Sequence, residues 1–427
     1  MWTELSNRYQ NLWHLPAGAR ESLASADYRL LLSSSTLWWL AHYMEMLVLG
    51  WLVLELTNSP ALVGLVAFCR AIPVLFVGGF GGMLADRIGR RPLIIAAQSV
   101  TVAMYAAVAL LLATGLAALW QLVVIALVLG CAWAMDWPTR RALIPDLVGR
   151  ARTLDALLLE SLGMGIARTL GPFAAGFVLN AYDALGCFLV LSGLSAISLL
   201  LLRALSRQTI PHTSSPSSAS PLAQIRDSVR YVQQNQPILA VTLITMIMNM
   251  LAFPYMNFLP VFARDILHQD PVGLGYLGAA VGVGSFCGLY LVGRVRHLAG
   301  PGQVFLVGTL ALNLALLAFA YSTDFLVSWA MLLVVGLGHA CFGILQSSIV
   351  LLAAADERRG QAMGAIAVAI GTGPFGRLLT GVLAQSFGAP VAVGGEAVVS
   401  FLLVAAVGAA LPGLRRMSAK ENSIDAT

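Results

Sequence analysis

The chain has little charge and almost no lysine. Only 11% of its 427 residues are charged, and Lys420 is the one lysine among 25 basic residues. A soluble domain of average composition carries roughly 25% charged residues. Hydrophobic residues instead make up 59% of the chain, with a mean hydropathy of +0.83. This composition excludes an ordinary soluble domain and indicates a protein that crosses the membrane many times.

Several kinds of site are also missing from the sequence. It has no phosphate-binding glycine loop, no cluster of metal ligands and no pairing of a nucleophile with a base. The five cysteines lie in or at the ends of apolar runs, without the spacing of a disulfide or zinc framework. The basic residues are dispersed over short loops, which argues against nucleic-acid binding. We therefore expect no enzyme activity, no cofactor and no metal, so any active transport would use an ion gradient.

Apolar runs long enough to cross a bilayer recur along the chain. A helix of about 20 apolar residues is sufficient for one crossing. The sequence predicts twelve, at residues 30–56, 61–84, 93–114, 118–137, 154–180, 185–203, 238–262, 271–293, 303–321, 325–353, 361–386 and 389–411. The predicted fold is an all-α polytopic membrane protein. The first 27 residues are polar and mixed, so no cleavable signal peptide is predicted.

The arginines fall on one side of this predicted topology. All but four of the 25 basic residues lie in the termini or in alternate loops. Short loops rich in arginine and lysine stay on the cytoplasmic side. The exceptions are Arg264 in an opposite loop and three arginines within spans, Arg70, Arg168 and Arg377. The pattern predicts a multi-pass protein of the cell (inner) membrane with both termini in the cytoplasm.

A polar segment in the middle divides the chain into two halves of six spans. We expect a cytoplasmic N-terminal segment, an N-terminal bundle, a cytoplasmic linker, a C-terminal bundle and a cytoplasmic tail, at residues 1–29, 30–203, 204–237, 238–411 and 412–427. Within the linker, Leu222, Ile225, Val229 and Val232 share one helical face. That pattern is typical of an amphipathic helix on the membrane surface, or of a plain solvated helix. The halves are weakly similar, because residues 171–176 resemble residues 376–381.

The most specific motif is the basic turn between the second and third spans. It consists of Gly82, Asp86, Arg87, Gly89, Arg90 and Arg91. These residues resemble the signature of the major facilitator superfamily of secondary transporters. The resemblance implies twelve transmembrane helices in two pseudo-symmetric six-helix bundles, with the cargo held between them. A second copy around residues 288–296 has Val292 in place of the acid.

Further segments give a narrower resemblance. Residues 56–60, 141–146 and 167–172 are similar to the branch that contains the enterobactin exporter and related efflux carriers. Gly171 and Pro172, with Gly176, look like the glycine-proline motif of proton-driven antiporters. The fourth span lacks the arginine-rich motif that many drug antiporters carry there. The resemblance implies that Asp86 and its arginine neighbours latch the two halves in one state; the alternative is a turn that only sets the topology.

Proton coupling is predicted at acids within the spans. Glu45 and His42 share one face of the first span, and Arg70 lies at a similar depth in the second. An ionisable group inside a membrane is costly unless it is paired or hydrated. Glu45 and Arg70 therefore form either a proton switch or a permanent ion pair. Asp136, near the end of the fourth span, is a further candidate that could join the Asp86 cluster.

Two arginines within spans, together with residues of the seventh and tenth spans, which line the cavity in this fold, are the predicted cargo contacts. The candidates are Arg70, Arg168, Asn249, Phe253, Asn257, His339 and Gln346. Arg168 has no evident partner in the sequence, so it binds either an anionic group or backbone carbonyls near Gly171. Arg377 and Glu396 have matching depths and are expected to form a structural pair.

The sequence thus predicts a secondary active transporter, monomeric in the lipid bilayer. It would move a small amphipathic molecule, drug-like or siderophore-like, by alternating access and proton-coupled export. The alternatives are a proton-coupled uptake symporter and a lipid-handling flippase on the same fold.

Overall fold

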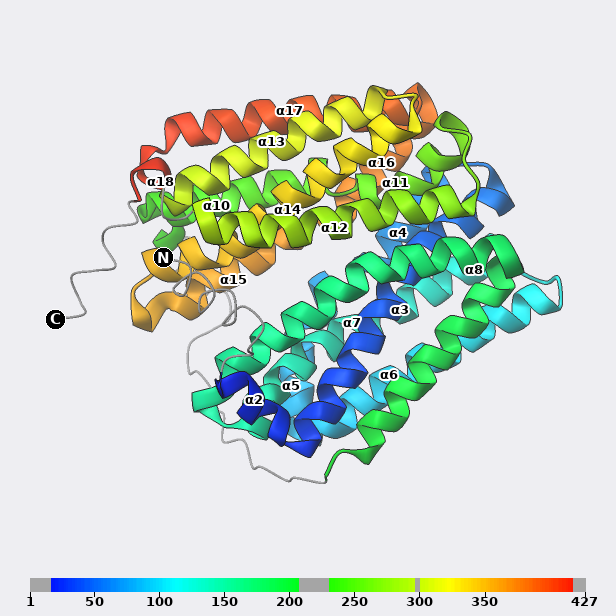
Figure 1. Cartoon of the computed structure of the whole chain (residues 1–427), viewed down its shortest axis with the longest axis horizontal. Coiled ribbons are helices and arrows are strands. Elements are labelled where there is room, and N and C mark those ends of the chain that lie inside the picture. Colours follow the sequence, from blue (N-terminus) through cyan, green and yellow to red (C-terminus); the bar gives the residue numbers. More distant parts are fainter. Residues whose placement is uncertain (1–16, 207–229, 296–299, 418–427) are drawn as a thin grey trace, which may run out of the picture.

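A computed structural model describes residues 17–206, 230–295 and 300–417, apart from the side chains of 17–20, 78–83, 85, 86, 150 and 295. In these ranges the chain is helical and contains no strand. Eleven of the helices in the described residues are long and apolar enough to cross a membrane. One of them, α8 (Thr153–Ala204), leaves helical geometry at Tyr182 and Asp183. Because it turns back there, as Figure 1 shows, the chain makes twelve passes.

The first six passes form one bundle, which begins with a short helix α2 (Ala17–Ala24). The second pass is broken into two helices between Ala71 and Pro73. The helices of this bundle are α3 (Ala26–Thr57), α4 (Pro60–Ala71), α5 (Pro73–Ile88), α6 (Arg90–Ala113), α7 (Leu119–Val148) and α8, with the 3-10 turn η1 (Arg150–Arg152) before α8.

The last six passes form the second bundle. Its first pass is irregular, with two π-helical segments, and its fifth is broken at Gly371 and Thr372. Its elements are α10 (Gln236–Ile247), η2 (Met248–Ala252), α11 (Tyr255–Val261), η3 (Phe262–Ile266), α12 (Pro271–Val295), α13 (Pro301–Tyr321), α14 (Phe325–Ala353), η4 (Asp356–Arg358), α15 (Arg359–Ile370), α16 (Gly373–Phe387), α17 (Ala389–Ala410) and α18 (Pro412–Arg416).

Side-chain caps mark several of the helix starts. Ser25, Ser59, Asn235 and Asp324 each accept a hydrogen bond from the backbone N–H three residues further on. Such caps satisfy donors that the first helical turn leaves unpaired. The polar residues between apolar runs therefore fix where the helices begin.

The twelve predicted spans are confirmed, with one clear error of extent. The fourth was predicted to end at residue 137, whereas α7 continues through Pro138 to Val148. The prediction stopped at the charged stretch after Trp137. The helix continues because Arg140 is buried and bonded to Asp136, one turn earlier on the same helix. The predicted amphipathic helix of the linker lies largely outside the described residues.

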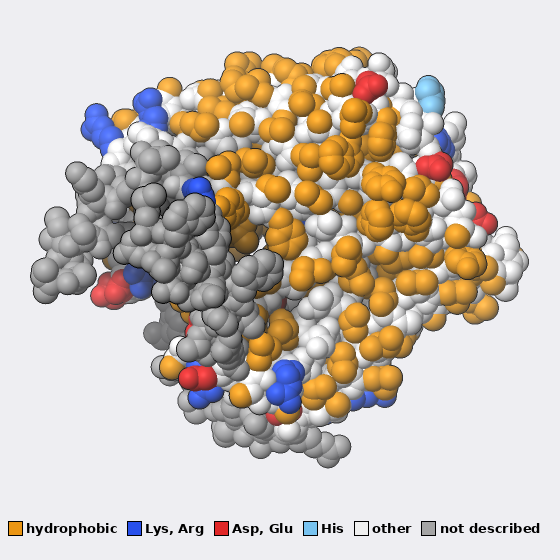
Figure 2. All heavy atoms as spheres, viewed as in Figure 1, with side chains coloured by type: hydrophobic (Ala, Val, Ile, Leu, Met, Phe, Trp, Pro, Cys, Tyr) orange, Lys and Arg blue, Asp and Glu red, His pale blue; other side chains and the backbone are white. Residues whose placement is uncertain are grey.

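The molecule has two ends with different character. The Asn58 end carries the turns at Asn58, Tyr182 and Gly388, and the linker end carries those at Gly89, Gly149 and Ala355. In Figure 1 the bundles meet at the Asn58 end, on the right, and their ribbons separate towards the left. Figure 2 shows a broad hydrophobic surface, with charged side chains of both signs gathered at the right and at the left and lower edges, and a histidine at the right.

Glycines bring the two bundles together near the Asn58 end. A Cβ added to Gly64 of α4 would meet the backbone of Arg377 at 2.6 Å and Gly381 at 2.8 Å, both on α16. On the other side, Gly176 of α8 packs in the same way on Gly275 of α12. The 171–176 and 376–381 segments, similar in sequence, thus occupy matching places in the two bundles. Hydrogen bonds from Arg264 to Asn58 and between Ser59 and Gln385 join the bundles at the same end.

Candidate functional site

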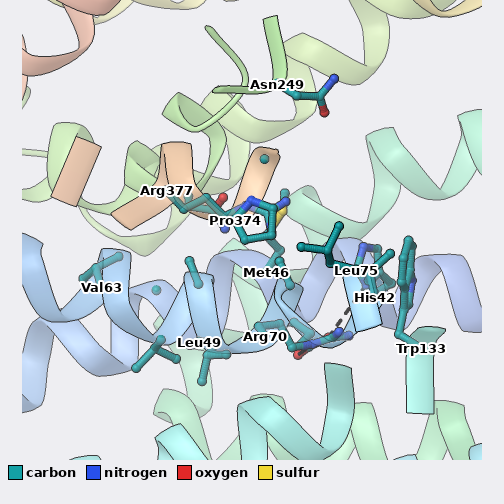
Figure 3. A pocket seen from close by; sticks show the side chains of 18 of the residues that line it. His42, Met46, Leu49, Val63, Arg70, Leu75, Trp133, Asn249, Pro374 and Arg377 are labelled. Carbon is teal, nitrogen blue, oxygen red and sulfur yellow. Dashed lines mark hydrogen bonds and ion pairs between the residues drawn. The ribbon is translucent and has the colours of Figure 1, made fainter. Parts of the chain in front are cut away.

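A cavity of about 180 Å³ lies between the two bundles (Figure 3). The first bundle contributes residues of α3, α4, α5 and α7, and the second contributes η2, α11 and the α15–α16 break. Most of the wall is aliphatic. The polar and aromatic lining residues are His42, Glu45, Arg70, Trp133, Trp137, Asn249, Asn257 and Arg377. An apolar wall with a few polar groups is typical of a small-molecule site.

Glu45 is held by a bidentate ion pair in this cavity. Its side chain is 2% exposed, and its two carboxylate oxygens accept from Arg70 Nε at 2.8 Å and Nη2 at 3.0 Å. The hydroxyl of Tyr105, on α6, donates to the second oxygen at 3.0 Å. The predicted Glu45–Arg70 pair is thus present in the structure. Tyr105 was not predicted, although its polar hydroxyl within an apolar span was a usable signal.

His42 lies one turn before Glu45 on the same face of α3, as predicted. Its Nδ1 is 3.8 Å from the nearer Glu45 oxygen and makes no hydrogen bond with a described residue. The imidazole stacks on Trp133 with ring centroids 5.8 Å apart and meets Trp39 edge to face. His42 therefore lies between Glu45 and a cluster of aromatic rings.

The Arg377 side chain points into the cavity and not towards Glu396. The predicted Arg377–Glu396 pair is wrong, because Glu396 accepts from the Thr380 hydroxyl at 2.7 Å. Within the part of the chain that the structure describes, the Arg377 side chain makes no hydrogen bond and no ion pair. It lies on α16, in the bundle opposite Arg70, and both side chains line the same cavity (Figure 3). Matching depth did not identify the partner, because depth does not determine how far a helix is rotated about its axis.

Only some of the predicted cargo contacts reach this cavity. Asn249 and Asn257 line it together with Arg70. Phe253, His339 and Gln346 are not among its lining residues. Phe253 packs on the His339 ring at 4.8 Å, and Gln346 is buried with its amide bonded to the Thr245 hydroxyl. These three belong to the packing inside the second bundle in this conformation.

Arg168 also lies outside the cavity wall, on α8. Its Nε donates to the Tyr43 hydroxyl at 3.1 Å, and its guanidinium lies 5.4 Å from the centre of the Tyr43 ring. The backbone carbonyl near Gly171, one of the two predicted partners, is not its contact here. Binding of an anionic group of the cargo stays a prediction. Gly171 and Pro172 are packing positions: Gly171 faces α3 at Leu40 and Met44, and Pro172 lies against Gly275 and Gly278 of α12.

Asp136 is part of a separate buried network in the first bundle. Its carboxylate binds Arg140, which is 2% exposed, through contacts of 2.5 and 3.2 Å. Arg140 also donates to Ser34 and to Gln98, and it lies over the Trp38 ring. Asp136 therefore has a full ionic partner one turn away on its own helix.

We expect Asp136→Ala to destabilise the protein strongly. Leaving Arg140 buried without its partner should cost about 3–5 kcal/mol. Unfolding in detergent, followed by tryptophan fluorescence against temperature, measures the effect. Asp136→Leu with Arg140→Met removes both charges and should recover most of the loss. A single variant as stable as the wild type would show that the pair is not structural. The role of Asp136 in proton coupling stays a prediction.

The basic turn between α5 and α6 binds within the first bundle. Arg90 donates to Asp146 at 2.6 Å and to the Ala142 carbonyl, and Arg91 donates to the Arg203 carbonyl. Arg87 is exposed, and Gly89 starts α6 with a φ of 91°, a conformation that favours glycine. The side chain of Asp86 lies outside the described residues, so the predicted latch stays a prediction.

Two helical bundles around a central cavity are the arrangement that the resemblance to the major facilitator superfamily of transporters predicted, and the family comparison places the chain in that superfamily. The chain belongs to the transmembrane secretion effector family, whose model matches residues 18–426. Both findings confirm the fold and class predicted from the sequence, and proteins of this class are transporters rather than enzymes.

Known proteins support this assignment. The chain is 24% identical to the staphyloferrin A transporter of Staphylococcus aureus, over 83% of this chain and 89% of that protein. It is 25% identical to the enterobactin exporter EntS of Shigella boydii, over 76% and 79% of the two chains. Among solved structures, the nucleoside transporter NupG superposes with a TM-score of 0.71 at 15% identity, covering 90% of this chain and 98% of that one. At 15% identity, the similarity to NupG shows a shared fold and nothing about function.

Proposed function

We propose that this protein exports a small amphipathic organic molecule, siderophore-like or drug-like, across the inner membrane by alternating access coupled to protons. The single observation that carries the proposal is the cavity between the bundles, with an aliphatic wall and a buried carboxylate–guanidinium pair. The pair supplies an ionisable group next to the cargo space. The export direction is supported by the exporter among its relatives and by the family description.

The sidedness follows from the arginines. Short basic loops stay in the cytoplasm, so the linker end faces inward and both termini are cytoplasmic. The Asn58 end, where glycines and hydrogen bonds join the bundles, then faces outward and is closed. In this assignment the described conformation is inward-facing, ready to take cargo from the cytoplasm.

Transport in vesicles tests this function. Everted vesicles with an acidic lumen reproduce the direction of export, and staphyloferrin A, enterobactin and ethidium serve as probes. At least one probe should accumulate in the lumen, and nigericin, which collapses the pH gradient, should abolish the accumulation. Vesicles with empty membranes are the control. Gradient-dependent accumulation in right-side-out vesicles with an acidic exterior, and not in everted ones, would contradict export and indicate uptake.

One observation favours uptake by proton symport as a second candidate. A proton on Glu45 would remove the charge that holds Arg70, so two guanidiniums, Arg70 and Arg377, would face the same cavity. An anionic cargo that enters with the proton would neutralise them. The two orientations of the vesicles distinguish this symport from antiport.

A further inference from the structure

The α15–α16 break places unpaired positive charge on the cavity. Gly371, Gly373 and Pro374 of this break line the cavity together with Arg377. The helix α16 has 15 residues and starts at Gly373, so its N-terminal end lies at the cavity wall. A helix N-terminus carries a partial positive charge, and Arg377 follows about one turn later. A cation near that end is unfavourable unless an anion balances it.

The other charged groups of the cavity cancel one another. Glu45 and Arg70 form a bidentate ion pair, and Tyr105 donates a further hydrogen bond to Glu45. The charge of the Glu45 carboxylate and that of the Arg70 guanidinium therefore balance each other. Among the described lining residues, this leaves Arg377 as the uncompensated charge. The neutral amide side chains of Asn249 and Asn257, from the same bundle, line the cavity as further polar groups.

We propose that Arg377 binds a carboxylate of the cargo, near the N-terminal end of α16 and across the cavity from the Glu45–Arg70 pair. A guanidinium matches a carboxylate with two parallel hydrogen bonds. One cation balances one carboxylate, whereas a phosphate monoester carries a charge of about −1.5 to −2 and would remain partly uncompensated. Drug-sized pockets span about 300–1,000 Å³. The cavity of about 180 Å³ therefore holds one acidic arm of the cargo in this conformation.

This assignment rests on the proposed transport function, but binding to purified protein tests it without transport. The probes are a citrate-based siderophore and its methyl ester, which has the same skeleton without the carboxylate charge. Wild-type protein should bind the acid at least tenfold more tightly than the ester. Arg377→Gln should lose that preference, and Arg377→Lys should keep part of it. Arg152→Gln, at an exposed arginine on η1, is the matched control and should behave as the wild type.

A structural role for Arg377 would give a different result. Because Arg377 has no ionic partner among the described residues, Arg377→Gln should leave the melting temperature of the cargo-free protein unchanged or raise it. Lower stability together with an unchanged preference for the acid would overturn the assignment, and so would a wild type that binds acid and ester equally. If Arg377 proves not to bind the carboxylate but the wild type still transports other probes in vesicles, the proposed transport function is retained.

Discussion

Glu45→Gln should reduce pH-gradient-driven transport to the level of empty vesicles while the protein remains folded. The carboxylate is the ionisable group that both Arg70 and Tyr105 bind, and glutamine preserves its shape but not its ability to take up a proton. Arg70 would lose its counter-charge, at a cost of up to about 3–5 kcal/mol. Vesicle transport under an imposed pH gradient, together with the melting temperature, measures both effects. Glu55→Gln, at an exposed position on the same helix, is the control.

A double variant separates the proton switch from a permanent ion pair. Glu45→Gln with Arg70→Gln removes both charges, so the stability lost in the single variant should return. If the pair is a switch, the double variant regains stability but not gradient-driven transport. Recovery of gradient-driven transport in the double variant would show that the pair is only structural.

Gly64→Leu should hold the bundles apart at the Asn58 end and stop turnover. The new side chain would meet backbone atoms of Arg377 and Gly381 at 2.6 and 2.8 Å, and backbone cannot move aside as the tip of a side chain can. Cysteines introduced at Ser59 and Gln385, which are hydrogen-bonded across the bundles, report the closure. They should form a disulfide in the parent protein and fail to do so with Gly64→Leu.

Gly193→Leu provides the matched control for this closure. No atom lies within 4 Å of a Cβ at Gly193, so the same substitution there should preserve both the disulfide and transport. Disulfide formation and wild-type transport in the Gly64→Leu protein would mean that the Asn58 end does not need this contact.

The sequence was sufficient for the architecture because the membrane imposes it. Apolar length and arginine sidedness each constrain the number of passes, and together they predicted all twelve, including the turn at Tyr182 within one continuous helix assignment. The predicted end of the fourth span was wrong for a local reason. A charged stretch looks like a loop, and only the Asp136–Arg140 pair, buried inside the bundle, allows the helix to continue there.

Matching depth in the membrane predicted one of the two ion pairs expected within the spans and failed for the other. Glu45 and Arg70 lie on adjacent helices and meet as expected. Arg377 and Glu396 satisfy the same depth criterion, but α16 is rotated so that Arg377 faces the cavity while Thr380 faces Glu396. Phe253 directly follows the π-helical segment η2, after which α-helical spacing no longer indicates the face. Rotation and irregular winding are set by tertiary packing, which periodicity does not contain.

The distribution of charge over the two bundles has an adaptive consequence. Buried ion pairs occupy the first bundle, at Glu45–Arg70 and Asp136–Arg140, whereas the cavity wall of the second bundle presents two amides and the lone guanidinium of Arg377. Proton coupling and recognition of a cargo carboxylate would then reside in separate halves of one polypeptide, although both halves line the cavity. A new specificity could arise through replacements in the second half alone, leaving the ionic machinery of the first half intact.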